Sequence, residues 1–264
     1  MQRRAQYSSD ISDRQWQLIR QLLPGRSRLG RRPIDRRRII NAILYVVRTG
    51  CQWRMLPKSF PNWSTVYGIF WNWRNDGVWQ RIHDKLREKV RKATGKKSTP
   101  TVAIVDSQSI RTAEGGEERG YDAGKKITGR KRHIAVDTLG MVLAVVVHRA
   151  DCQDQYGAEW VMDKLGEQFR RLKVVFGDSA YGRSGLPDWV KETFGWVLQT
   201  VLRPANVRGF VILPKRWIVE RTFAWLARYR RHSKDYEKTI ASSEALTYIA
   251  MINLMSRRLA NASN

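Results

Sequence analysis

The sequence predicts an α/β protein in two parts, a helical domain followed by a domain built on a mixed sheet. Residues 1–95 carry apolar side chains at helical spacing and show no strand pattern, whereas β-rich runs and helical stretches alternate from Thr101 onward. The polar stretch KATGKKSTP between these regions contains Gly and Pro and is the best linker in the chain. We therefore expect one domain over residues 1–95 and a second over residues 101–264.

Helices are expected throughout the first domain. Ser12 and Gln15 have the spacing of a capping box at the start of ISDRQWQLIRQLLP, and a proline ends that helix. The next helix, IDRRRIINAILYVVRTG, carries an apolar stripe and ends at Gly50. A third helix in PNWSTVYGIFWNWRNDG is capped by Ser64 or Thr65, and VWQRIHDKLREKVRKA forms another.

Helices joined by short turns, with arginines beside them, are typical of a DNA-binding module of the helix-turn-helix kind. The arginines placed to contact DNA are Arg31 and Arg32 in the basic loop GRSRLGRRP and Arg74 on the third helix. The alternative is a helical domain in which the tryptophans only fill the core.

The second domain begins with the β-rich runs TVAIVD, RHIAVDTLG and MVLAVVVHRA, of which the last two meet at Leu139 and Gly140 as in a hairpin. A helix is expected from Asp154 to Arg171. It is followed by a buried strand in KVVFGDSAY, a helix in LPDWVKETFG, a strand in WVLQTVLR and a last helix in RWIVERTFAWLARYRR. This order implies a mixed sheet with helices on its faces.

The charge of the chain indicates a polyanionic partner. Lys and Arg number 49 against 24 Asp and Glu, and the formal net charge of +25 would make the compact state repel itself without such a partner. Nucleic acid is the leading candidate. An anionic membrane is the alternative, but the basic residues are spread along the chain and form no amphipathic segment.

The sequence contains no signal for export. No apolar stretch follows the first residues as the core of a signal peptide would, and the longest apolar run, Met141 to Val147, is too short to span a bilayer. We therefore expect a cytoplasmic, nucleoid-associated protein. Two distant cysteines and four isolated histidines indicate no zinc site.

Two acidic residues come directly after apolar strand runs, Asp106 after TVAIV and Asp178 after KVVFG. Active sites of open α/β sheets lie beyond strand ends where neighbouring strands part, so these carboxylates can converge. Glu220, on the last helix, is the natural third member. The alternatives are a cap of the following turn for Asp106, a turn residue for Asp178 and an ion pair with Arg216 for Glu220. The runners-up, which end no strand as cleanly, are Asp137, Asp151 and Asp154.

Such a set of carboxylates suits phosphodiester chemistry. In-line displacement builds negative charge on the attacking and the leaving oxygen, and two divalent cations about 4 Å apart can stabilise both. Oxygen ligands select Mg²⁺ or Mn²⁺ over zinc. We therefore expect two Mg²⁺ or Mn²⁺ ions held by Asp106, Asp178 and Glu220.

The helix around Glu220 also carries basic residues for DNA. Arg216 lies one helical turn before the glutamate and can meet a phosphate bound at the metal. Small side chains at Ala224 and Ala227 leave the glutamate face open. The remaining arginines, which spread charge over other faces and the helix end, are Arg221, Arg228, Arg230 and Arg231.

Five long motifs of the chain are WRMLPKSFPNWSTVYGIFWNWRNDGVW, VDSQSI, GGEERGYDAGKKITGRKRHIAVDTLG, VVFGDSAYGR and RWIVERTFAWLARYRRHSKDYE. They closely resemble bacterial insertion-sequence transposases of the family named for insertion sequence five, over nearly the whole chain. The resemblance implies an RNase H-like catalytic domain with an Asp-Asp-Glu triad, which falls on Asp106, Asp178 and Glu220. The family also has an arginine shortly before the glutamate, and Arg216 matches it in this chain.

The related signature further expects a tyrosine upstream and a basic residue after the glutamate. This chain has Leu213 and Ala227 at those places, so the tyrosine role is unfilled and Arg228 is the adjacent substitute for the basic residue.

By this resemblance the protein is a cut-and-paste DNA transposase acting on an element with terminal inverted repeats. A metal-activated water attacks the phosphodiester at the element end, and the freed 3′-hydroxyl then attacks target DNA. Handling two element ends implies a homodimer in the DNA complex. The basic run that would track phosphates, unless it is only a solvated hairpin loop, is Lys125, Lys126, Arg130, Lys131 and Arg132.

Two other functions agree with the same residues. A nuclease or resolvase would share the carboxylates but would cut DNA without joining it. A DNA-binding repressor descended from such an enzyme would bind DNA without cleaving it.

Overall fold

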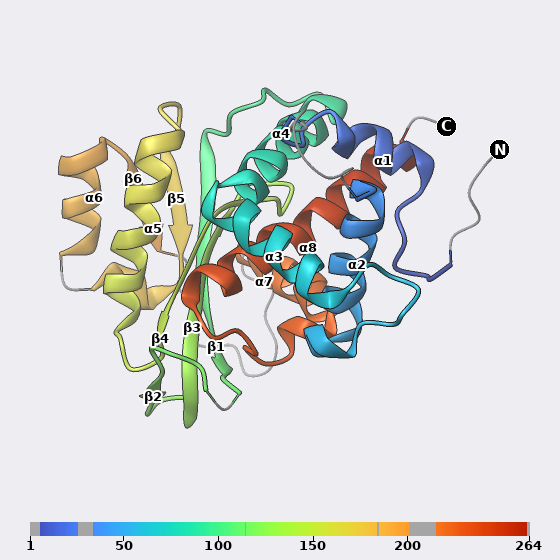
Figure 1. The fold of residues 1–264 in the computed structure, drawn as a ribbon. Helices are drawn as coiled ribbons and strands as arrows, with labels where there is room; N and C mark the ends of the chain where they lie inside the picture. Colours follow the sequence, from blue (N-terminus) through green and yellow to red (C-terminus); the bar gives the residue numbers. More distant parts are fainter. Residues whose placement is uncertain (1–5, 26–33, 114, 184, 201–214, 263–264) are drawn as a thin grey trace. The chain divides into compact units, whose positions relative to one another are not determined.

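The structure is a computed structural model that describes residues 6–25, 34–113, 115–183, 185–200 and 215–262 (Figure 1). The chain divides into two compact units, one helical and one built on a sheet. The helical unit comprises Met1–Ser98, Leu226–Ser233 and Ala245–Asn264, and the sheet unit comprises Thr99–Trp225 and Lys234–Glu244. The C-terminal segments thus group with the helical unit rather than with the sheet, a division that the sequence did not suggest.

The predicted helices of the first region are all present. They are α1 (Asp13–Arg20), α2 (Arg36–Thr49), α3 (Trp63–Asn75) and α4 (Val78–Ala93), with the short 3₁₀ helix η1 (Trp53–Met55) before α3. The capping box at α1 is confirmed, because the side chains of Ser12 and Gln15 each accept the other's backbone N–H. The cap of α3 is Asn62 rather than Ser64 or Thr65, and its side chain accepts the Ser64 N–H at 2.9 Å.

A long C-terminal helix, α8 (Ile240–Asn261), had no counterpart among the predicted elements. From Ala245 onward it belongs to the helical unit. Gln15 of α1 donates to Ser256 Oγ at 3.0 Å, and the ring of His83 in α4 lies 4.9 Å from that of Tyr248. The N-terminal helices therefore bury their core against the end of the chain. Neither α8 nor any other helix in the described ranges has the length and apolar character to cross a membrane.

The sheet unit contains the predicted mixed sheet. Its strands are β1 (Val102–Arg111), β2 (Gly120–Asp122), β3 (Ile127–Val136), β4 (Val142–Arg149), β5 (Val174–Gly177) and β6 (Val197–Thr200). Their order is β2-β3-β1-β5-β6, with β4 also paired to β3. β3 runs antiparallel to β1 and β4, whereas β1, β5 and β6 run parallel to one another.

Helices cover both faces of this sheet (Figure 1). α5 (Asp154–Gln168) and α6 (Leu186–Phe194) pack on one face over an apolar core. α7 (Arg216–Ala227) lies on the other face, where Thr222 Oγ1 donates to the Gly140 carbonyl in the β3–β4 turn at 2.9 Å. We call these the α5 face and the α7 face.

Candidate active site

Asp106 and Asp178 lie level with each other on neighbouring parallel strands. β1 and β5 pair in constant register up to Ile104 opposite Phe176, and the same register continued for two residues sets Asp106 beside Asp178. Neighbouring strands are about 4.8 Å apart. The prediction that Asp106 ends a strand is wrong, because β1 continues to Arg111. The strand that ends here is β5, so the two strands part at the two carboxylates.

Both aspartates project toward the α7 face. Successive side chains of a strand point to opposite faces, and Val105 and Val175 belong to the core beneath α5. Asp106, the neighbour of Val105, therefore points to the α7 face. Asp178 keeps an extended backbone, with φ −79° and ψ −179°, and lies three residues after Val175, which places it on the α7 face as well.

Glu220 comes from α7, the helix that covers this face. Ile218, Val219 and Thr222 are buried, whereas the Glu220 side chain is 47% exposed. Lys215, just before the helix, lies with Nζ 3.8 Å from the centre of the Phe176 ring. This contact ties the start of α7 to β5, two residues before Asp178.

The charges of Asp178 and Glu220 both act on Asp106. Burial raises the pKa of Asp106 to about 6, with a further rise from the charges of Asp178 and Glu220. The hydrogen bond from the Ser107 N–H and the charge of Arg216 oppose that rise. Because charge effects fade with distance, these groups all lie near Asp106. The three predicted catalytic acids thus share one electrostatic environment.

Each carboxylate also makes one local contact. The contacts are Asp106 Oδ1 with the Ser107 N–H at 2.8 Å, Asp178 Oδ1 with the Ala180 N–H at 2.9 Å, and Glu220 Oε1 with Arg216 Nε at 3.5 Å. Asp178 thus caps the short 3₁₀ helix that follows it, and the contact of Glu220 is the ion pair with Arg216 that the sequence offered as an alternative. Among the residues that the structure describes, no three His, Cys, Asp or Glu side chains are arranged to hold a metal ion. The charges of Asp178 and Glu220 reach Asp106, but the three acids do not form a ready-made metal site.

The donor set nevertheless suits a hard divalent cation. Three carboxylates offer only oxygen atoms, the ligands that Mg²⁺ and Mn²⁺ prefer. The negative charges of Asp178 and Glu220 repel that of Asp106 and raise its pKa, and a bound cation would offset this repulsion. Because the Glu220 side chain is nearly half exposed, it can leave Arg216 without opening the core.

The acidic runners-up have structural partners instead. These are the backbone N–H groups of Leu139 and Met141 for Asp137 (both 2.9 Å), Arg149 for Asp151 (2.5 Å) and Lys131 for Asp154 (3.0 Å). Asp137 therefore shapes the β3–β4 turn, and the other two form ion pairs.

The predicted phosphate contacts differ in exposure. Lys125, Lys126 and Arg228 are exposed, and Arg216 is partly exposed. Arg74 is partly exposed and lies 5.4 Å from the ring of Trp71. Arg31 and Arg32, together with Leu213 at the unfilled tyrosine position, lie outside the described residues.

Arg130, Lys131 and Arg132 are in the middle of β3, between β1 and β4, and not in a hairpin loop. They are 0%, 7% and 1% exposed. Arg130 pairs with Asp235 at 3.2 Å, and Lys131 pairs with Asp154 at 3.0 Å. Arg130 and Lys131 thus have their charge matched inside the protein, and the buried Arg132, like them, does not present its charge to a phosphate at the surface.

The arginines that follow Glu220 were expected to spread their charge over the helix surface, but Arg221 and Arg231 are held by other groups of the protein. Arg221 stacks between Trp217 and Trp225, with ring centres at 4.5 and 4.7 Å. Arg231 lies beyond the end of α7, in the 3₁₀ helix η3 (Arg230–His232). It is buried and donates to the Cys51 carbonyl at 3.0 Å.

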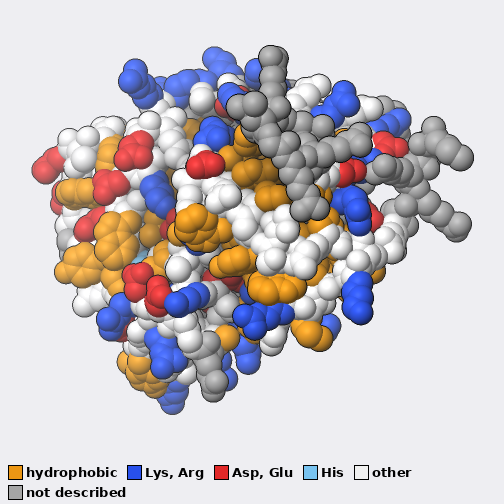
Figure 2. All heavy atoms as spheres, viewed as in Figure 1, with side chains coloured by type: hydrophobic (Ala, Val, Ile, Leu, Met, Phe, Trp, Pro, Cys, Tyr) orange, Lys and Arg blue, Asp and Glu red, His pale blue; other side chains and the backbone are white. Residues whose placement is uncertain are grey.

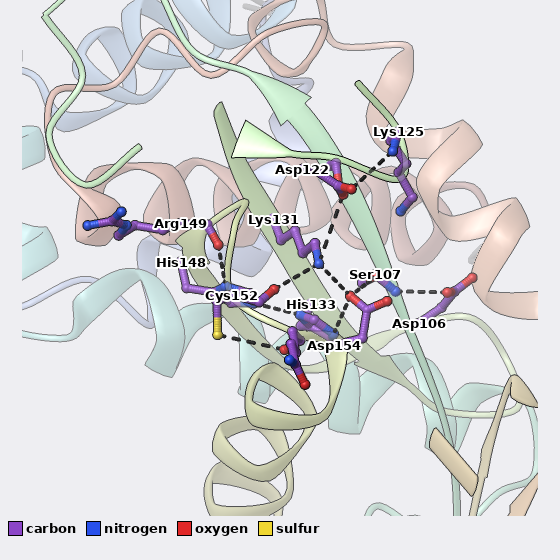
Figure 3. Close-up of polar contacts among 12 residues, drawn as sticks. Asp106, Ser107, Asp122, Lys125, Lys131, His133, His148, Arg149, Cys152 and Asp154 are labelled. Atoms are coloured by element: carbon purple, nitrogen blue, oxygen red, sulfur yellow. Dashed lines mark hydrogen bonds and ion pairs between the residues drawn. The ribbon is translucent and has the colours of Figure 1, made fainter. Parts of the chain in front are cut away.

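Sequence reasoning missed a second group of polar side chains on the opposite side of β1 (Figure 3). We call this group the β1 polar cluster. Hydrogen bonds and ion pairs join its members, which are Ser107, Ser109, Asp122, Lys131 and Asp154. The motif VDSQS could have indicated this group. Successive side chains of a strand point to opposite faces, so Ser107 and Ser109 must lie on the face opposite to Asp106.

Two sequence families match the chain. One, described as "Transposase DDE domain", matches residues 97–255, and the other, described as "Putative transposase of IS4/5 family", matches residues 11–83. The first match alone covers more than half of the 264 residues.

Individual relatives cover less of the chain. "Insertion element IS402 uncharacterized 16.2 kDa protein" from Burkholderia cepacia is 36% identical over 117 residues, which is 42% of this chain and 78% of that protein. "Putative transposase for insertion sequence element IS402", from the same organism, is 28% identical over 121 residues, 42% of this chain and 54% of its own length. "Uncharacterized protein y4sN" from Sinorhizobium fredii is 32% identical over 69 residues, 26% of this chain and 55% of that protein. The chain thus spans about half the length of the last two.

The family match agrees with the fold. A helical N-terminal region followed by a mixed sheet is consistent with the RNase H-like form of the DDE domain. Such a domain implies a catalytic transposase that acts on DNA and uses a divalent metal. The chain therefore belongs to the DDE transposases of the IS4/IS5 family.

Proposed function

We propose that this transposase binds the terminal inverted repeats of an insertion sequence, hydrolyses the DNA at the element ends and joins the freed 3′-hydroxyls to target DNA. The observation that carries the proposal is the shared electrostatic environment of Asp106, Asp178 and Glu220 where β1 and β5 part. Hydrolysis and joining are both in-line attacks on a phosphodiester, so one site can serve both.

Asp106, Asp178 and Glu220 would hold two Mg²⁺ or Mn²⁺ ions. When bound, the ions stabilise the charge on the attacking and leaving oxygens. The chain itself fixes Asp106 through the Ser107 N–H and supplies Glu220 from an exposed helix face. Arg216, once Glu220 turns away from it, is placed to bind a phosphate oxygen.

DNA would meet the α7 face. Ala224 and Ala227 are exposed beside Glu220, so small side chains leave room for a duplex, and Arg228 is exposed just beyond the helix. The α5 face is unsuitable for a polyanion. Figure 2 shows acidic side chains gathered over α5 and α6, at the left of the view, where the exposed acids are Asp163, Glu167, Asp188 and Glu192.

Further phosphate contacts would come from Lys125 and Lys126, exposed in the turn between β2 and β3, and from Arg74 on α3. Arg31 and Arg32, which lie outside the described residues, remain predicted contacts. Because two element ends must be processed together, the active form in the DNA complex would be a homodimer.

The proposal is tested with labelled donor DNA that carries the element ends, incubated with target DNA and Mg²⁺ or Mn²⁺. The wild type should yield cleaved ends and joined products, and chelation should abolish both. Glu220→Gln and Asp106→Asn should lower the cleavage rate by at least about 10³, equivalent to several kcal/mol of transition-state stabilisation, and should still bind the ends in a mobility-shift assay.

The other outcomes identify the alternatives. Cleavage without joined products would indicate a nuclease or resolvase. Specific DNA binding by a wild type that never cleaves would indicate a regulator. Full activity in Glu220→Gln would exclude this glutamate from the site.

A further inference from the structure

The β1 polar cluster lies directly behind the candidate active site. Ser107, the residue after Asp106, has its hydroxyl oxygen 3.2 Å from Asp154 Oδ1 at the start of α5. The same oxygen of Asp154 lies 3.0 Å from Lys131 Nζ, which also donates to the Cys152 carbonyl at 2.8 Å. Figure 3 shows these side chains converging on the α5 side of β1. The Ser107 side chain is thus held by a charged pair.

The other half of the cluster repeats this pattern two residues along the strand. The Ser109 hydroxyl donates to Asp122 Oδ2 at 2.6 Å, and Asp122 Oδ1 accepts the Lys125 N–H at 3.0 Å. Lys131 Nζ lies 3.9 Å from Asp122 Oδ2. One buried lysine therefore lies between two carboxylates, each of which holds one serine of β1.

The charges of this cluster are matched. The Lys131 and Asp122 side chains are 9% and 10% exposed, and that of Asp154 is 33% exposed. Burial alone would raise the pKa of Asp154, but the hydrogen bond and charge of Lys131 outweigh it and lower the pKa. An ion pair that satisfies both partners in a buried setting holds its side chains in one geometry.

Ser107 connects this fixed cluster to the active site. Its hydroxyl lies on the α5 face, and its backbone N–H donates to Asp106 Oδ1 on the α7 side at 2.8 Å. Because neighbouring side chains of a strand leave on opposite faces, fixing the Ser107 side chain also fixes the direction in which Asp106 leaves the strand. The same residue thus orients both the backbone and the carboxylate of Asp106.

We propose that Asp154, held by Lys131, is a positioning residue that acts through Ser107 to orient Asp106 for metal binding. This inference rests on the proposed function of Asp106 as a metal ligand. A residue that orients a ligand affects metal affinity and rate together, and its loss typically costs about 10 to 100-fold. Misplacement of a reacting group by about 1 Å has an effect of similar size.

Ser107→Ala is the sharpest variant, because it removes the hydroxyl link but leaves the Lys131–Asp154 pair and the Ser107 N–H in place. Ser107→Thr keeps a hydroxyl, and a β-branched residue is well tolerated in a strand. Ser109→Ala is the matched control. It removes an equivalent hydroxyl from the same strand and face, but Ser109 is not adjacent to Asp106.

The experiment measures Mn²⁺ binding to the full chain by electron paramagnetic resonance, without DNA, alongside thermal melting and single-turnover cleavage. Ser107→Ala should weaken Mn²⁺ binding and slow cleavage about tenfold, with DNA affinity unchanged. Ser107→Thr should restore both to within about twofold of the wild type. Ser109→Ala should melt like Ser107→Ala but bind Mn²⁺ as the wild type does.

Asp106→Asn serves as the reference that separates the two proposals. If it abolishes Mn²⁺ binding while Ser107→Ala binds as the wild type does, the positioning role is overturned and the metal site stands. If Ser109→Ala weakens Mn²⁺ binding as much as Ser107→Ala, the cluster only stabilises the strand and the inference is also overturned. If Asp106→Asn binds Mn²⁺ normally, the proposed metal site fails and the inference fails with it.

Discussion

The two faces of β1 shift the pKa of acidic side chains in opposite directions. On the α5 face, Asp154 pairs with buried Lys131, which lowers the pKa of the carboxyl group. On the α7 face, burial and the charges of Asp178 and Glu220 raise the pKa of Asp106 to about 6. Asp106 and Ser107, which are adjacent in the sequence, therefore lie beside acids that repel one another on one face and beside a charge-balanced network on the other.

The α5 face of β1 thus contributes to the stability of the fold, whereas the acids on the α7 face are arranged as in a ligand-binding site. A matched ion pair contributes to stability, whereas unmatched acids reduce it and are typical of functional sites. Changes on the α5 face should thus destabilise the protein, and changes on the α7 face should alter activity with small or even favourable effects on stability. Four substitutions test this contrast.

The largest expected effect is on the α5 face. Lys131→Met removes the cation between Asp154 and Asp122 and leaves one buried and one partly buried carboxylate without it, so the free energy of unfolding should fall by about 3 kcal/mol. Urea denaturation at neutral pH measures the change. Arg149→Met is the control, because Arg149 pairs with Asp151 at the surface, and it should denature like the wild type. Equal effects of the two substitutions would contradict the contrast.

Gly157→Ala tests how closely α5 packs on the sheet. A Cβ at Gly157 would lie 2.4 Å from His133 Nδ1 and 2.5 Å from His148 Nε2, two atoms that hydrogen-bond to each other at 2.8 Å. The helix or the histidines must move, so we expect a loss of about 2 kcal/mol in urea denaturation. Ala224→Ser, at an exposed position of α7, should change stability by less than about 0.5 kcal/mol. A neutral Gly157→Ala would show that the α5 face is loosely packed.

Asp106→Asn should stabilise the metal-free protein. The carboxyl of Asp106 ionises near pH 3.8 in the unfolded chain and near pH 6 in the folded one, so its favourable contribution is complete below pH 3.8 and is lost as the pH rises through about 6. At pH 7.5 the buried charge opposes folding, by at most about 3 kcal/mol, and we expect Asn to recover about 1 kcal/mol. Denaturation in chelator at pH 7.5 and pH 4 measures this gain, which should disappear at the lower pH. A gain that is independent of pH would rule out the charge as its cause.

The smallest effect on stability is expected at Arg216. Its ion pair with Glu220 joins side chains that are 30% and 47% exposed, and such surface pairs contribute less than about 0.5 kcal/mol. Arg216→Ala should therefore melt almost as the wild type does but cleave more slowly, since it removes the proposed contact with a phosphate. Arg216→Lys, which keeps the charge, should recover part of the rate. A large drop in melting temperature would instead make the ion pair structural.

Much of the fold was predictable because local patterns determine it. Alternating and helical periodicities located the strands and helices, and the Leu139–Gly140 dipeptide located the β3–β4 turn. The grouping of Asp106 with Asp178 was also predictable, since each follows a β-rich run and parallel strands bring such residues level. Local pattern and strand pairing agree at these positions.

The remainder depends on partners that are distant in the sequence. In the sequence Arg130 resembles a surface cation, because its partner Asp235 is 105 residues away and comes next to it only in the folded chain. β2 is only three residues long and is defined by its pairing with β3, so no run of β-forming residues could reveal it in advance. The extent of β1 beyond Asp106 likewise follows from pairing with β3 and not from its own composition.

The dependence of the N-terminal helices on α8 affects the order of events during synthesis. Tyr248 and Ser256, which contact α4 and α1, are synthesised after the whole sheet unit, so the helical unit cannot complete its core until α8 has been made. We therefore expect a product truncated before α8 to be degraded by proteases rather than to occupy element ends as an inactive competitor. DNA recognition by this unit would begin only after α8 has been made, and by then the three candidate catalytic acids, which all precede α8, are already part of the chain.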